Sequence, residues 1–280
     1  MQMRIVESFL RAKAGEIELC EDAFVVTSDF ACVVDGVTSK SDKNIEGMRA
    51  GAFVSRLIVE IVKELRPNME CKEALRFITK RMIEKYKEKG LYEILTDDLL
   101  LQPAACMVIY SKARNEIWMV GDCQALVDGQ LYTNEKKVDE TIAEMRSYWL
   151  EGEIISGKTI EELIEQDTSR DVLKPFFEKQ ICFQNSGFES DYSYEALAGF
   201  KEVSKFKLVK FDALPSYVVL ASDGFPILRP TLEETLEELE KIKREDPLMF
   251  RIHKSTKGVK KGANSFDDCC YLKLCQGTVL

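Results

Sequence analysis

Short apolar runs in this chain come in neighbouring pairs, and stretches with helical spacing lie between the pairs. Runs rich in β-branched and aromatic residues predict strands at residues 3–10, 23–28, 30–34, 104–110, 116–120, 125–127, 130–132, 201–211, 217–222 and 270–274. Apolar residues that recur every three or four positions predict helices at residues 44–65, 72–89 and 231–244. Residues 136–200 are charged, helix-prone and rich in loops, which sets them apart from the rest of the chain.

The order of these elements argues for one fold class. Strands that are neighbours in sequence pair most simply as antiparallel sheets, and grouped helices then cover the sheets from outside. A doubly wound parallel sheet would instead need strands and helices that alternate one by one. We therefore expect an α+β fold with layered antiparallel sheets. Residues 1–280 would form a single domain, with 136–200 as a helical and loop insertion over one face.

Composition narrows the class of protein. With 280 residues, 45% of them hydrophobic, the chain can bury one large core or two small ones. Its net charge of −9 argues against general binding to nucleic acid, because that binding needs clustered Lys and Arg. The longest basic cluster, residues 254–261, has no interleaved aromatic residues and is interpreted as a solvated loop.

The cysteines and the N-terminus bear on the compartment. The nine cysteines are odd in number and have no CxxC spacing, which indicates buried free thiols in a reducing environment. The first residues lack the apolar core of a signal peptide, and no window of eighteen apolar residues occurs. We therefore expect a cytoplasmic protein. His253 is the single histidine, which argues against a zinc site and against a Ser-His-Asp or Cys-His arrangement.

Five acidic signatures stand out, and four of them lie beside or at the end of a predicted strand. They are Glu21-Asp22, Asp35-Gly36, Asp122, Asp223-Gly224 and Asp267-Asp268. A strand is stiff, so a carboxylate at its end is held in place. Several such carboxylates at one point would form an all-oxygen site for a hard divalent cation. Such a site favours metal-assisted chemistry on a phosphate or a similar anion.

Each signature also has a plain structural interpretation. Asp128-Gly129 lies between two short strand-like runs and is interpreted as a hairpin turn without function. Asp35-Gly36 and Asp223-Gly224 could be turns as well, although neither leads into a second strand. The other three could be a solvated pair, a bulge and an exposed loop end. The set as a whole argues for a site, and glycine-rich motifs for nucleotide phosphates are absent.

The ordered set resembles the metal-dependent serine/threonine protein phosphatases of type 2C. Their motifs correspond to Glu21-Asp22-Ala23, Val33-Val34-Asp35-Gly36, Gly121-Asp122-Cys123-Gln124, Ser222-Asp223-Gly224 and Asp267-Asp268. The resemblance runs from about residue 15 to residue 275 in the same order. It implies two stacked antiparallel sheets flanked by helices, an α-β-β-α sandwich.

The resemblance also implies roles for the acidic residues around two Mg²⁺ or Mn²⁺ ions. Asp35 would bridge the two ions, and Gly36 would offer its carbonyl to one of them. Asp223 and Asp267 would hold the first ion, whereas Glu21 would reach the second through water, with Asp22 in support from nearby. Asp122 would help to bind a third, weaker ion. Asp35, Asp223 and Asp267 would therefore carry catalysis. A water activated by the cations would attack the phosphorus in line with the leaving oxygen.

This chain departs from the resemblance at the residues that handle the substrate phosphate. Ile17 stands where animal members have a phosphate-binding arginine, and Val37 stands where they have a histidine that could act as general acid. Lys40 is expected to bind the substrate phosphate instead, with Lys13 as the alternative, although a surface lysine is the plain interpretation. Two arginines of the insertion, Arg146 and Arg170, are either further phosphate contacts or ordinary surface residues.

Three functions remain open at this point. The leading one is metal-dependent hydrolysis of phosphoserine or phosphothreonine on a phosphorylated protein partner in signalling. The second is a catalytically weak or inactive relative that acts as a regulatory binding module. The third is a phosphatase of small phosphorylated metabolites. Neither nucleic acid nor a membrane is expected as a partner.

Overall fold

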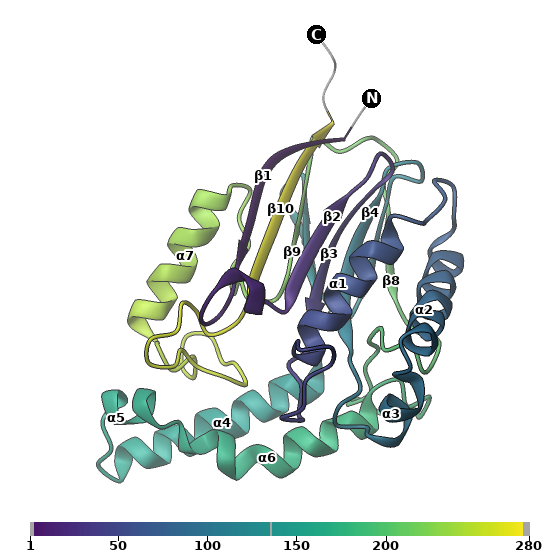
Figure 1. Cartoon of the computed structure of the whole chain (residues 1–280). Coiled ribbons are helices and arrows are strands. Elements are labelled where there is room, and N and C mark those ends of the chain that lie inside the picture. The colour runs from purple at the N-terminus through teal and green to yellow at the C-terminus, as the bar shows by residue number, and fades with distance from the viewer. Residues whose placement is uncertain (1–2, 135, 277–280) are drawn as a thin grey trace.

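The computed structural model describes residues 3–134 and 136–276, which form two five-stranded antiparallel sheets stacked face to face (Figure 1). The first sheet has the order β1 (Met3–Arg11), β10 (Cys269–Gln276), β9 (Tyr217–Ala221), β6 (Gln124–Val127) and β7 (Gln130–Tyr132). The second has the order β2 (Asp22–Val26), β3 (Phe30–Gly36), β4 (Ala105–Ser111), β5 (Glu116–Val120) and β8 (Lys207–Lys210). Every strand pair is antiparallel, as the paired pattern in the sequence predicts.

The core between the sheets follows from the alternation of side chains along each strand. In β3, Ala31 and Val33 point into a cluster that both sheets share, together with Leu220 and Leu272 of the opposite sheet. Cys32, between them, faces the other way into a second cluster. Burial on both faces explains why β3 is apolar at consecutive positions rather than at every second one.

Helices cover the outer face of each sheet. The second sheet is covered by α1 (Ala50–Val62) and α2 (Cys71–Glu88), with the short α3 (Tyr92–Asp97) beside them. The amphipathic α7 (Leu232–Glu245) packs Leu239 and Ile242 against the first sheet. The architecture is therefore the expected α-β-β-α sandwich.

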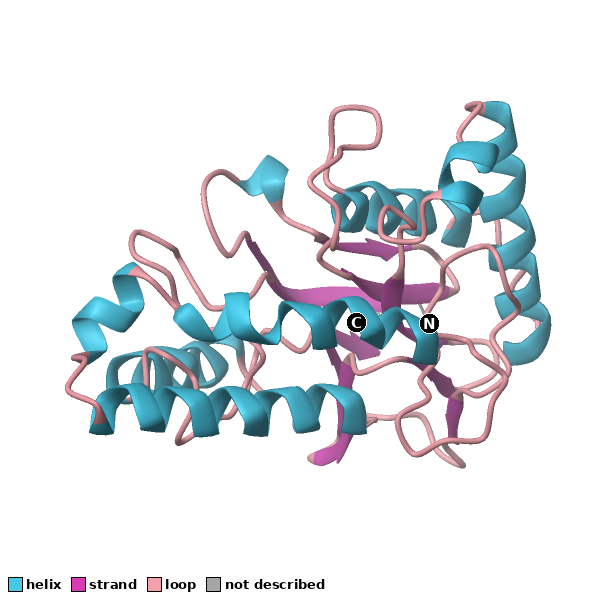
Figure 2. Ribbon diagram, turned by 90° about the horizontal axis from the view of Figure 1, so that it is seen from below, coloured by secondary structure: helices cyan, strands magenta, loops and turns pink. Residues whose placement is uncertain are grey.

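Residues between β7 and β8 form a layer of helices at one end of the sandwich, opposite to the two chain ends (Figures 1 and 2). This layer contains α4 (Lys137–Ile155), α5 (Ile160–Glu165) and α6 (Thr168–Gln180), followed by the short 3-10 helix η2 (Ile181–Phe183). A second 3-10 helix, η1 (Ile17–Leu19), lies near the N-terminus. Ile142 of α4 packs with Leu173 and Phe177 of α6, so the layer has a small apolar core of its own.

Two boundary predictions are wrong. The helix expected from residue 44 begins only at Ala50, because Glu46 and Gly47 have positive φ angles of 49° and 79° and the chain turns there. The strand expected over 201–211 is limited to β8, whose partner β5 ends at Val120 and offers no further backbone to pair with.

The two kinds of Asp-Gly pair behave differently. Asp128 and Gly129 form the tight turn between β6 and β7, with φ angles of 47° and 86°, so the hairpin prediction is confirmed. Asp35 instead lies within β3, where it pairs with Cys106 of β4 and Asp22 of β2. The plain-turn interpretation of Asp35 is therefore wrong, and the strand itself fixes this carboxylate.

Candidate metal centre

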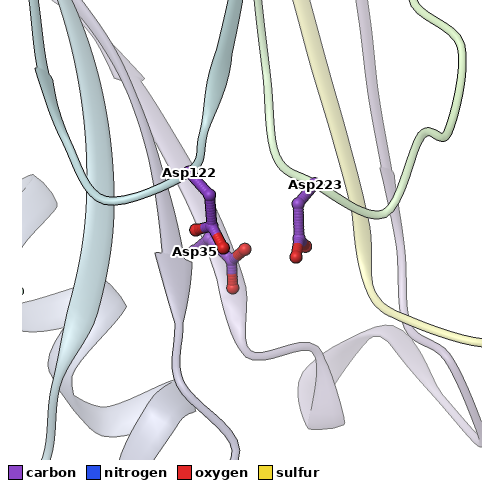
Figure 3. A group of neighbouring side chains, drawn as sticks. All are labelled: Asp35, Asp122 and Asp223. Carbon is purple, nitrogen blue, oxygen red and sulfur yellow. The ribbon is translucent and has the colours of Figure 1, made fainter. Parts of the chain in front are cut away.

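Three aspartates from different parts of the chain meet at one end of the sandwich (Figure 3). Asp35 comes from the end of β3, Asp122 from the connection between β5 and β6, and Asp223 from the turn after β9. One carboxylate oxygen of each residue lies within 4.8 Å of one oxygen of the other two. The structure thus brings together three of the acidic residues that the sequence singles out.

Glycines next to these aspartates allow the close approach. Gly121 has a φ of 76°, and a Cβ atom there would lie 2.2 Å from Sγ of Cys106. A Cβ atom on Gly224 would lie 1.8 Å from the carbonyl oxygen of Asp268. Other residues would therefore push Asp122 or Asp223 away from the meeting point, which gives both glycines a physical reason to be there.

Burial and mutual repulsion perturb these carboxylates. Burial raises the pKa of Asp35 and of Asp223 well above the ordinary value, and the charges of neighbouring aspartates raise both further. Burial would also raise the pKa of Asp122, but the ammonium of Lys136 outweighs it and the pKa falls. Lys136 lies 2.8 Å from Oδ2 of Asp122, while the buried Oδ1 has no hydrogen-bond partner among the described residues.

The donor set fits a divalent cation. Three closely spaced, half-buried carboxylates repel one another when all are charged, and a cation or protons offset that repulsion. Carboxylate oxygens are the ligands that Mg²⁺ and Mn²⁺ prefer. Oδ1 of Asp122 is buried and has no hydrogen-bond partner among the described residues, as expected of an oxygen that binds a metal ion.

The other expected ligands lie around this cluster but engage lysines. Lys13 binds Glu21 through its ammonium, which also lies 2.7 Å from Asp268 and 3.7 Å from Asp267. Lys257 lies 2.5 Å from the second oxygen of Asp267. The structure therefore places Glu21 and Asp267 in ion pairs, outside the group formed by Asp35, Asp122 and Asp223.

Asp22 and Gly36 lie on adjacent strands beside the cluster. The Oδ2 atom of Asp22 is buried without a hydrogen-bond partner among the described residues. Burial raises the pKa of Asp22 well above its ordinary value, and the charge of Asp268 adds to the effect. Gly36 donates its N–H to the carbonyl of Glu21 at 3.1 Å, which ties the end of β3 to the segment before β2.

A cavity of about 560 Å³ opens onto the aspartates and collects cationic side chains on its other walls. The ammonium of Lys40 lies 5.7 Å from the ring centre of Phe177, and the guanidinium of Arg170 lies 4.2 Å from the same ring. Burial lowers the pKa of Lys40 to about 8, and the charges of Lys257 and Arg170 contribute. Lys40 has no ion pair within the described part of the chain, so the cavity offers an uncompensated cation.

The two arginines of the insertion have different places. Arg170 lines the cavity and donates to the carbonyl of Thr256 at 2.8 Å. Arg146 is fully buried, pairs with Asp167 at 2.7 Å and donates to the carbonyl of Leu248 at 2.7 Å. It ties α4 to the segment before β10 and is not among the residues that line the cavity, and its full burial makes the interpretation as a surface arginine wrong for Arg146.

Ile17, Val37 and His253 have different places around the site. Ile17 lies in η1 with 45% of its surface exposed, and Val37 packs in a small apolar cluster with Ala104. His253 packs edge-on against Phe266, and burial lowers its pKa. Val37 and His253 line the cavity, whereas Ile17 is not among its lining residues.

Sequence reasoning missed two lysines of the site. Lys257 belongs to the basic cluster 254–261, and the prediction of a solvated loop is wrong for it, because Lys257 lines the cavity and pairs with Asp267. Lys136 directly precedes α4, where a lysine is usually solvated, yet it is held between Asp122 and Asp139. Only the tertiary arrangement reveals either role.

Comparison with known proteins identifies the fold. No family model matches the chain, and no curated protein matches it. The crystal structure of the serine/threonine phosphatase PstP/Ppp of Mycobacterium tuberculosis does match, with a TM-score of 0.51, 14% sequence identity, and coverage of 99% of this chain and 100% of that one. The chain has the fold of the type 2C serine/threonine phosphatases. The resemblance that the ordered motifs carry is thereby confirmed at the level of the fold.

Two further crystal structures are similar to the chain at lower TM-scores. Serine/threonine phosphatase Stp1 of Staphylococcus aureus is 14% identical, with a TM-score of 0.48 and coverage of 98% of this chain and 96% of that one. The catalytic domain of PstP in complex with two manganese ions is 15% identical, with a TM-score of 0.47 and coverage of 98% of each chain.

Among the described residues, no helix is both long and apolar enough to span a membrane.

Proposed function

We propose that the protein is a divalent-metal-dependent phosphatase that hydrolyses phosphoserine or phosphothreonine in proteins. The observation that carries this proposal is that one cavity contains both a half-buried aspartate cluster and a cation, Lys40, that has no ion pair among the described residues. Asp35, Asp122 and Asp223 would hold Mg²⁺ or Mn²⁺, and Lys40 would attract the phosphate. An acidic cluster alone or a basic cluster alone would not bring a metal and a phosphate together.

The residues divide the work of the reaction between them. Asp35, Asp122 and Asp223 would hold the cation, and a bound cation would supply a water of lowered pKa as the nucleophile. Lys40 and Arg170 would bind the phosphoryl oxygens and offset the charge that builds up on them. Both side chains lie near the ring of Phe177, whose attraction for cations would help to order them before the substrate arrives.

The rim of the cavity favours a protein substrate over a small metabolite. Three leucines line it, Leu19, Leu99 and Leu100, with 58%, 57% and 39% of their surfaces exposed. Exposed leucines beside a polar site suit the apolar side chains that flank a phosphoserine in a peptide. A small, highly charged metabolite would gain nothing from them.

A second function has its own support. Lys13 and Lys257 already neutralise Glu21 and Asp267, so part of the acidic set is balanced without any metal. This arrangement favours a regulatory module that binds a phosphorylated protein through Lys40 and Arg170 without hydrolysing it.

The deciding experiment is hydrolysis of p-nitrophenyl phosphate by the full chain with EDTA, Mg²⁺ or Mn²⁺. Wild type should turn over only with metal, and Asp35→Asn and Asp223→Asn should lose that turnover. Asp128→Asn is the matched control, because Asp128 also precedes a glycine but lies in the β6–β7 turn. A folded wild type that is inactive with every metal would reject the phosphatase and leave the binding module. A phosphopeptide panel then separates protein substrates from small phosphomonoesters.

A further inference from the structure

The ammonium of Lys13 lies in surroundings that resemble those of a bound cation more than those of a surface lysine. It contacts the carboxylate of Glu21, lies 2.7 Å from Oδ2 of Asp268 and 3.0 Å from the hydroxyl oxygen of Thr38, and is 3.7 Å from Asp267. Four oxygen-bearing groups from three different segments therefore surround one positive charge. Three of the four are carboxylates, which is the composition of a hard-cation site.

The backbone of Lys13 is fixed as firmly as its side chain. Its N–H donates to Oδ1 of Asp268 at 2.9 Å, so this carboxylate binds both ends of the same residue. Its carbonyl accepts from the N–H groups of Asn264 at 2.8 Å and Ser265 at 3.2 Å. Lys13 is thus anchored to the segment that leads into β10, and its ammonium cannot move away without breaking several hydrogen bonds.

Burial makes this charge necessary. The side chains of Glu21 and Asp268 are 1% and 3% exposed, and a buried carboxylate needs a partner of opposite charge. Lys13, itself 22% exposed, supplies that charge to both. Oε1 of Glu21 is buried and has no hydrogen-bond partner among the described residues, but a divalent cation bound there would lie beside the ammonium on Oε2 against strong repulsion.

We propose that Lys13 acts as a built-in cation in place of a second metal, so that this protein binds one divalent ion, at Asp35, Asp122 and Asp223. Glu21 is then the counter-ion of Lys13 and not a metal ligand. The inference rests on the proposed metal site, and it departs from the two ions that the sequence resemblance implies. It makes Lys13 a positioning residue that sets how many ions the site takes.

The test counts bound Mn²⁺ on the full chain near neutral pH, by calorimetric titration and by electron paramagnetic resonance of the free ion. Wild type and Lys13→Arg should bind one ion. Lys13→Met, which removes the charge but keeps the length, should bind two. The control is Lys43→Met, which removes an exposed lysine paired with Asp98 and should still bind one.

A second readout covers a variant that is poorly folded without metal. In EDTA, Lys13→Met should melt below wild type because Glu21 and Asp268 lose their partner, and Mn²⁺ should raise its melting temperature more than it raises that of wild type. Two ions on wild type, or one ion on a folded Lys13→Met, would overturn the inference. One ion on a wild type that hydrolyses no phosphomonoester would reject the phosphatase proposal and leave the inference about Lys13 standing.

Discussion

Oδ2 of Asp122 lies 2.8 Å from the ammonium of Lys136, and this contact leaves Oδ1 of Asp122 buried and free of hydrogen bonds within the described chain. The lysine therefore orients the carboxylate and keeps it ionised. Burial alone would raise the pKa of Asp122, whereas the lysine brings it below the ordinary value. This contact therefore keeps the carboxylate of Asp122 available to a cation at a pH where protons still compete with the cation for Asp35 and Asp223.

Lys136→Met should shift the acid limb of Mn²⁺ binding to higher pH. Without the ammonium, burial raises the pKa of Asp122, so protons compete with the metal at a pH where they do not in wild type. We expect a shift of about one pH unit or more, the usual effect of losing a close charge partner. Titration of Mn²⁺ affinity against pH measures it. Lys137→Met, which removes an exposed lysine paired with Asp191, should leave the profile unchanged; equal shifts in both variants would contradict the assignment.

Lys40 should give substrate binding a basic limit. Its pKa is lowered to about 8 by burial and by nearby cations, so the ammonium is lost as the pH rises through that value. The KM for a phosphopeptide should therefore rise above about pH 8 in wild type. Lys40→Arg keeps its charge at all accessible pH values and should abolish the rise. Lys40→Met should raise KM at neutral pH by about 10-fold or more, as expected for loss of a charged hydrogen bond. An unchanged KM in Lys40→Met would remove Lys40 from the phosphate site.

Asp35→Asn should stabilise the metal-free protein while it destroys the metal site. Burial raises the pKa of Asp35 above its ordinary value of 3.8, so the folded state holds the proton more tightly than the unfolded state. This contribution to stability is complete below pH 3.8 and is lost as the pH rises through the raised folded value. In EDTA, the melting temperature of wild type should fall over that range and that of Asp35→Asn should fall less.

At neutral pH, the metal-free Asp35→Asn variant should melt several degrees above wild type, since about 1 kcal/mol moves the midpoint of a domain of this size by about 2–4 °C. Added Mn²⁺ should reverse the order, because it stabilises wild type alone. Asp128→Asn again serves as the control. If wild type is the more stable protein in EDTA, the aspartate cluster does not carry the repulsion that we infer.

Gly121→Ala should cost both stability and metal binding. The φ of 76° strains any residue with a side chain, and the added Cβ would also meet Sγ of Cys106 at 2.2 Å. Gly129→Ala is a matched control, because Gly129 has a φ of 86° but its nearest neighbour in that direction is 3.9 Å away. Strain alone costs on the order of 1 kcal/mol, and the clash should add about 1–3 kcal/mol. Denaturant unfolding measures both, and equal losses would exclude the clash.

The sandwich fold can be predicted from the sequence because local patterns of apolar residues and turns specify its elements. Each of three local patterns predicts its own element: the apolar runs predict β3 and β9, Asp128-Gly129 predicts a two-residue turn, and the amphipathic spacing predicts α7. The acidic positions followed for the same reason, since Asp35 and Asp223 lie at strand ends. The irregular turn before α1 was missed because helical spacing continues through residues that do not form a helix.

The lysines of the site are much harder to predict from the sequence than the aspartates. Lys136 and Lys257 carry no local signature, and their roles depend on loops that meet only in the folded chain. The sequence also does not predict that Lys13, rather than a metal ion, would bind Glu21. Lys13 lies eight positions away in sequence, yet the segment before β10 is what holds it in place.

The helical layer between β7 and β8 has a consequence for how this protein could change. The aspartates come from the sandwich, whereas Arg170 and the Phe177 ring that it contacts come from α6. The acidic cluster and part of the cationic wall of the cavity are therefore encoded in separate stretches of the gene. Replacement of the stretch that encodes α4–α6 would therefore change the walls of the cavity around Arg170 and keep the aspartates in place, which makes this layer the place to alter what the cavity binds.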